Sequence, residues 1–205
     1  MFDYAEAIEA FIGDVAKNCR VLGHIDVSSL LIGCIRARNA ECSGLYARTI
    51  PLRFEGGSTT TVRKGVPIRI PIVRHGDREA LYMISFCLPR FQNLQFEDKV
   101  MTIFHELYHT SPNFDGDIRR FAGSKYVHTA SQKKYDELMR ELSQQYLQQT
   151  ARPELHEFLR LNYAELCERH GGVKMRIFRA PRPEIVKDNA ARTVSVHMQE
   201  KKEKR

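Results

Sequence analysis

The pentapeptide His105-Glu106-Leu107-Tyr108-His109 constrains this chain more than any other part of its sequence. Residues four apart lie on one face of a helix, so the imidazoles of His105 and His109 can reach the same metal ion. The carboxylate of Glu106 then lies near the open side of the metal, where it can take a proton from a bound water. The spacing therefore predicts a zinc ion held by His105 and His109, with Glu106 as general base.

The residues around this HELYH motif favour an amphipathic helix. Apolar residues recur before it at three- and four-residue spacing, and the acids Glu97 and Asp98 suit the first turn of a helix. Ser111 and Pro112 end the helix just after His109. The alternative is a pair of histidines on a solvated helix face with an accidental glutamate between them.

Length and composition indicate one soluble domain. The chain has 205 residues, of which 42% are hydrophobic, and no apolar run approaches the ~20 residues that span a membrane. The start of the chain does not resemble a signal peptide, so we expect a cytoplasmic protein without membrane contact. Its five cysteines are scattered and form no CxxC pair, which argues against disulfides and against a zinc ribbon.

Basic residues are concentrated at the end of the chain. The formal charge is +7, and from Val173 onward ten basic residues face four acidic ones. We expect a domain over residues 1–178, followed by a basic and flexible tail over 179–205. Such a tail can contact nucleic acid through phosphates, or it can serve as a solubilising extension.

Hydrophobic periodicity predicts an α+β fold, with a small mixed or antiparallel sheet packed on the HELYH helix and on further helices. The prolines between residues 66 and 73 favour an edge strand or an extended segment there. A capping box starting at Thr129 and a break at Pro153 bound one long helix. We expect helices over residues 4–17, 129–149 and 154–169, strands over 45–54, 80–88 and 173–178, and a short helix or strand within 24–35.

A catalytic zinc normally has a third protein ligand besides an open position. We predict His128, because the eighteen residues after His109 allow the chain to turn and return, and the Thr129 cap fixes its surroundings. Asp115 and Asp117 are the alternative ligands, and a later residue is a further possibility.

Three other side chains follow the motif at short distance. Tyr126 lies two residues before His128 and is predicted either to donate a hydrogen bond to an oxyanion or to pack in the loop. Arg119 and Arg120 follow the Asp-Gly-Asp turn, and pairing with its aspartates is the simpler expectation than binding of a substrate carboxylate.

Residues 103–120 resemble the phage-type metallopeptidases, a zincin-like group in which HELxH is followed by a proline, an aromatic and glycine turn, an arginine and a further histidine. The resemblance extends over about residues 81–138, and the SprT-like zinc proteases are a related group. In zincins a strand leads at once into the HExxH helix, as residues 80–88 do here. The resemblance implies zinc on His105 and His109, with Glu106 as base and His128 as the further histidine.

These patterns lead to the expectation of a zinc metallopeptidase that hydrolyses peptide bonds of a peptide or protein substrate, using a zinc-activated water and Glu106. The alternative is a catalytically degenerate, zincin-like zinc protein that binds DNA or a protein partner through its basic tail.

Overall fold

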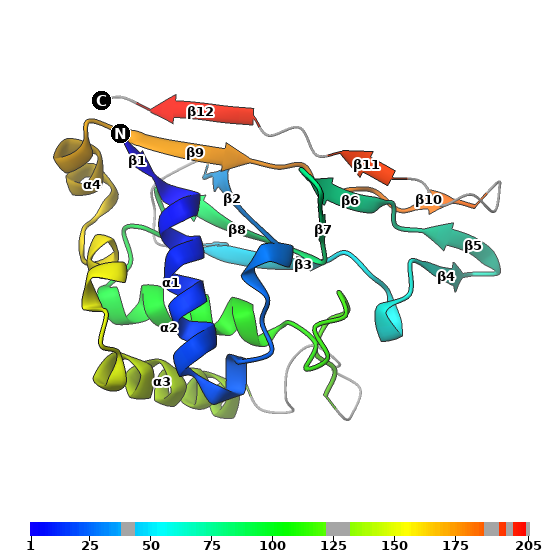
Figure 1. Cartoon of the computed structure of the whole chain (residues 1–205), viewed down its shortest axis with the longest axis horizontal. Helices are drawn as coiled ribbons and strands as arrows, with labels where there is room; N and C mark the ends of the chain where they lie inside the picture. Colours follow the sequence, from blue (N-terminus) through cyan, green and yellow to red (C-terminus); the bar gives the residue numbers. More distant parts are fainter. Residues whose placement is uncertain (38–43, 122–131, 187–192, 196–198, 204–205) are drawn as a thin grey trace.

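Four α-helices and several small sheets form an α+β fold in the described part of the chain (Figure 1). The computed structural model describes residues 1–37, 44–121, 132–186, 193–195 and 199–203. The predicted α+β class is thereby confirmed. Within these ranges, no helix combines the length and the apolar character needed to cross a membrane.

The central sheet has the order β2-β8-β3, formed by β2 (Leu30–Arg36), β8 (Tyr82–Leu88) and β3 (Ala47–Pro51). β2 runs parallel to β8, whereas β3 runs antiparallel to it and places Thr49 opposite Ile84. All seven residues of β8 are buried, as expected for the middle strand of a sheet that is covered on both faces. The sheet is therefore small and mixed, as the sequence predicts.

Two helices cover one face of this sheet, α1 (Tyr4–Asn18) and α2 (Phe96–Tyr108), and α3 (Gln132–Gln149) packs against them from outside. Asp3 caps α1 by accepting a hydrogen bond from the main-chain N–H of Glu6. α1 contacts β2, whereas α2 contacts both β3 and α3 (Figure 1). The apolar faces of α1 and α2 join that side of the sheet in the larger hydrophobic core.

The predicted single helix over 154–169 is wrong. Asn162 begins a new helix, because its side chain and that of Glu165 form a capping box, and Gly171 ends it in the left-handed conformation. The segment before Asn162 forms only short 3-10 turns. The observed elements are η4 (Pro153–Leu155), η5 (Glu157–Arg160) and α4 (Tyr163–His170).

Four short strands follow β3 along the chain: β4 (Thr60–Arg63), β5 (Val66–Arg69), β6 (Ile72–His75) and β7 (Arg78–Ala80). β6 and β7 pack against the opposite face of the central sheet, and β4 and β5 extend beyond it (Figure 1). The predicted extended segment over 66–73 divides into two strands that belong to different sheets. Leu31, Val73 and Met83 lie in a second, smaller hydrophobic cluster on this side.

Three short strands lie within the described residues of the basic tail. β12 (Gln199–Glu203) pairs antiparallel with β9 (Val173–Ile177), whose other side pairs with β1 (Phe2–Asp3). β10 (Glu184–Ile185) pairs with β5, and β11 (Thr193–Ser195) pairs with β6. Without the tail, β5, β6 and β9 would present unpaired main-chain N–H and C=O groups at the edges of these sheets, and these groups form hydrogen bonds with the tail. The composition of the tail alone does not predict this pairing.

Candidate metal centre

The HELYH motif occupies the last turn of α2, as predicted, and His109 is the C-terminal cap of the helix. Val100, Ile103 and Phe104 bury the apolar face of α2 completely. The rings of His105 and His109 lie side by side, with centroids 4.7 Å apart and planes at 82°. The helix thus brings the two predicted ligands together.

The spacing of these rings fits a shared zinc ion. Zinc binds imidazole nitrogen at ~2.1 Å in a tetrahedral shell, which places the centroids of two ligating rings roughly 5 Å apart. The observed 4.7 Å between His105 and His109 agrees with this value. The two side chains therefore need little movement to bind one metal.

Glu106 is buried, with 6% of its surface exposed, and points to the edge strand β3. The hydroxyl of Thr49 lies 2.8 Å from Oε2 of Glu106 and 2.9 Å from its carbonyl oxygen, so it can donate its proton to either. Burial raises the pKa of Glu106 to about 7, although the hydrogen bond from Thr49 opposes this shift. The position of this carboxylate is thus fixed by a strand 57 residues away in sequence.

Tyr135 of α3 covers the histidine pair. Its ring centroid lies 4.9 Å from that of His105 and 6.1 Å from that of His109, and only 1% of the residue is exposed. Burial raises the pKa of its phenol well above the usual range. The periodicity of α3 places Tyr135 on an apolar face, but no local pattern connects this residue with the histidines.

A turn held by Tyr82 follows the HELYH motif. The Tyr82 hydroxyl accepts hydrogen bonds from the main-chain N–H groups of Ser111 (3.2 Å) and Gly116 (3.0 Å) and donates one to the carbonyl of Asp117 (2.8 Å). Gly116 has a φ of +86°, and a β-carbon there would lie 2.6 Å from Cγ of Arg53. One buried phenol therefore fixes the path of the chain after His109.

The carboxylate of Asp117 forms structural hydrogen bonds, and none of them joins it to the two histidines of the HELYH motif. Its carboxylate accepts two hydrogen bonds of 3.0 Å from Arg120 and further ones from the main-chain N–H groups of Gly56 and Ile118. The expected internal pairing of Arg120 is confirmed. Arg119 instead places its guanidinium 4.1 Å from the ring centre of Tyr108.

The predicted third metal ligand does not lie among the residues that the structure describes. Among the described residues, no group of three or more His, Cys, Asp or Glu side chains is placed to hold a metal ion, so neither Asp115 nor Asp117 joins the histidines in this structure. The predicted ligand His128 and the predicted oxyanion donor Tyr126 lie outside the described residues. Both assignments stay predictions.

Comparison with known proteins finds no relative of this chain. The chain matches no protein-family model, and no curated protein or solved structure shows significant similarity to it. The functional argument therefore depends on the HELYH motif and on the geometry around it.

Proposed function

We propose that the chain is a zinc-dependent peptidase whose metal is bound by His105 and His109. One observation supports this most: the two imidazoles lie 4.7 Å apart on the last turn of α2, with the buried Glu106 carboxylate between them in sequence. A carboxylate next to two such rings is the minimum set for hydrolysis by a metal-activated water. His128 is the proposed third ligand.

Zinc, when bound, supplies Lewis-acid activation of a water molecule and of the substrate carbonyl. Glu106 accepts a proton from the attacking water as the carbon–oxygen bond forms. It then returns this proton to the amine nitrogen as the carbon–nitrogen bond breaks. Thr49 is a positioning residue, because its hydroxyl lies 2.8 Å from the Glu106 carboxylate and limits its rotation.

The edge strand β3 suits an extended peptide substrate. β3 pairs with β8 on one side, and the described strands leave its other side open. An open edge can bind an extended backbone by strand addition. Because Thr49 of β3 contacts Glu106, a peptide on this edge would run next to the proposed base.

Metal analysis and peptide hydrolysis test the proposal together. We expect about one zinc per chain after purification without chelators, and loss of this zinc in His105→Ala and His109→Ala. Glu106→Gln should keep the zinc and lose hydrolysis of unfolded protein by roughly 100-fold or more, as removal of a general base predicts.

Glu97→Gln provides the matched control, because Glu97 is exposed on the first turn of the same helix. This variant should retain both zinc and activity. A wild-type chain without zinc would contradict the proposal. Full zinc content with unchanged cleavage by Glu106→Gln would exclude Glu106 as the base, and metal without any cleavage would favour a binding protein.

A further inference from the structure

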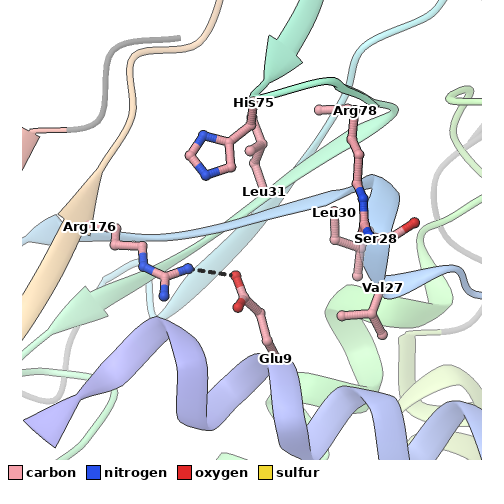
Figure 2. A pocket seen from close by; sticks show the side chains of 9 residues that line it. Glu9, Val27, Ser28, Leu30, Leu31, His75, Arg78 and Arg176 are labelled. Carbon is pink, nitrogen blue, oxygen red and sulfur yellow. Dashed lines mark hydrogen bonds and ion pairs between the residues drawn. The ribbon is translucent and has the colours of Figure 1, made fainter.

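A second cavity lies at the opposite edge of the central sheet from the metal centre. It has a volume of about 380 Å³ and is formed by α1, by the start of β2, by the β6–β7 hairpin and by β9. Figure 2 shows the side chains of this cavity, which we call the β2-edge pocket. It is lined by Glu9, Val27, Ser28, Leu30, Leu31, His75, Arg78, Ala80 and Arg176.

The pocket combines an apolar base with charged walls. Leu30, Leu31 and Ala80 are buried and contribute aliphatic surface. In Figure 2, Glu9 extends from α1 toward Arg176, whereas His75 and Arg78 come from the hairpin on the other side. A cavity with an apolar base and a few converging polar groups is typical of a small-molecule site.

The Glu9 wall is preorganised to receive a positive charge. Arg176 donates a hydrogen bond of 2.9 Å to Oε1 of Glu9 and also contacts Asp3 at 3.4 Å, so its charge is already balanced. Burial raises the pKa of Glu9 despite the contact with Arg176. A second cation next to the other oxygen of Glu9 would therefore stabilise the carboxylate.

The hairpin wall offers donors for an anion. Arg78 is exposed and forms no ion pair within 4.0 Å with the described part of the chain. Asp26 lies near it, since hydrogen bonds from Ser28 and, more weakly, the charge of Arg78 lower the pKa of Asp26. The guanidinium of Arg78 can bind a carboxylate through two hydrogen bonds.

We propose that the β2-edge pocket binds a small zwitterion with an apolar body, such as an aliphatic amino acid or a short peptide with free ends. Glu9 holds its ammonium group, Arg78 holds its carboxylate, and Leu30 with Leu31 contacts its aliphatic part. The volume of about 380 Å³ lies at the lower end of small-molecule sites, so folded macromolecules do not fit.

Titration calorimetry with four probes tests the charge pattern. Leucine and dileucine carry both charges, N-acetylleucine lacks the ammonium group, and leucinamide lacks the carboxylate. We expect at least one of the first two to bind, and the two blocked compounds to bind about 10-fold more weakly or not at all. Comparison of leucine with dileucine distinguishes an amino acid from a peptide ligand.

Variants assign the binding to this pocket. Arg78→Ala should weaken binding of the zwitterion about 10-fold. Arg74→Ala should leave this affinity unchanged, because Arg74 belongs to the same hairpin but does not line the pocket. Glu9→Gln should remove the preference for a free ammonium group, and its thermal unfolding shows whether loss of the Arg176 contact affects folding. His105→Ala should leave binding unchanged, which separates this pocket from the metal centre.

Two results would overturn the proposal. The first is absence of binding by both zwitterions at millimolar concentration. The second is equal binding by wild type and Arg78→Ala, or loss of binding in His105→Ala, either of which would place the ligand elsewhere. Neither result bears on the zinc content of the chain, so the proposed peptidase activity is tested separately.

Discussion

Tyr82 shows how a single side chain of the central sheet determines the surroundings of the HELYH motif. Its hydroxyl makes three hydrogen bonds to the main chain of the turn after α2, at Ser111, Gly116 and Asp117. A hydroxyl can accept two of these hydrogen bonds and donate the third, whereas an apolar side chain of similar size can make none of them. The strand therefore specifies where the chain goes once it leaves His109.

Tyr82→Phe should lower the free energy of unfolding by roughly 2–4 kcal/mol, because it leaves buried main-chain groups without partners. Tyr4→Phe is the matched control, since the Tyr4 hydroxyl donates a single hydrogen bond, to the side chain of Gln92. Its effect should be about 1 kcal/mol. Denaturant unfolding measures both values, and equal effects of the two substitutions would contradict the role assigned to Tyr82.

The helices and strands that sequence periodicity predicts well are those with one long apolar face. α1, α2 and β8 appear close to their predicted positions, because burial against a single core determines them. The prediction fails over 154–169, where a capping box at Asn162 outweighs helical periodicity. In the described residues of the tail, pairing with distant strands such as β9 determines the short strands, and local periodicity does not encode such pairing.

The residues of the candidate site also differ in whether local sequence spacing predicts them. The spacing of His105, Glu106 and His109 is local, so the sequence alone predicts that helix and its two ligands. Thr49 and Tyr135 reach the site from β3 and α3 through contacts that span 57 and 30 residues. Such contacts depend on the tertiary fold, and no pattern in a single sequence encodes them locally.

Lys99 connects α2 to η5 and to Leu161, the residue that follows η5. The residue is 2% exposed, and its ammonium group donates hydrogen bonds to the carbonyl oxygens of Leu159 (2.7 Å) and Leu161 (2.8 Å). Burial lowers the pKa of Lys99 to about 8. Helical periodicity would place Lys99 at the solvent-exposed surface of α2, but the residue is buried and connects α2 to η5.

Lys99→Met should destabilise the protein by roughly 2–4 kcal/mol at pH 7, because two buried carbonyl groups lose their donors. Between pH 8 and 10.5 the unfolded chain keeps a proton that the folded protein has released from Lys99. The wild type should thus gain stability relative to the variant as the pH rises. The difference in the free energy of unfolding between wild type and variant should increase by roughly 2 kcal/mol from pH 7 to pH 10.

Urea unfolding of both proteins at the two pH values measures this gap, in which the titration of all other groups cancels. Lys17→Met, at an exposed position on the last turn of α1, should show neither effect. A gap that narrows as the pH rises would contradict the pKa shift of Lys99.

At the scale of the whole molecule, the two ends of the chain meet on β9. β1 pairs with one side of this strand and β12 with the other. Side-chain contacts strengthen the second pairing: the Tyr163 hydroxyl donates to Glu203 at 2.6 Å, and Lys174 contacts Glu200 at 2.7 Å. Acidic residues in an otherwise basic tail thus attach it to the domain.

Deletion of residues 199–205 should lower the free energy of unfolding by roughly 2 kcal/mol and remove the protection of β9 amides from hydrogen exchange, because β9 loses its outer partner. The double substitution Lys201→Ala and Lys202→Ala changes the charge of β12 but keeps its backbone. It should leave exchange unchanged. Unaltered protection after the deletion would show that β12 does not pair with β9 in solution.

The attachment of α2 at both ends has a consequence for the proposed zinc site. Lys99 fixes the beginning of the helix, and Thr49 together with the turn on Tyr82 fixes its end. The backbone that presents His105 and His109 is therefore ordered before any metal arrives. The conformational entropy of these two ligands is lost during folding, so little of it opposes metal association.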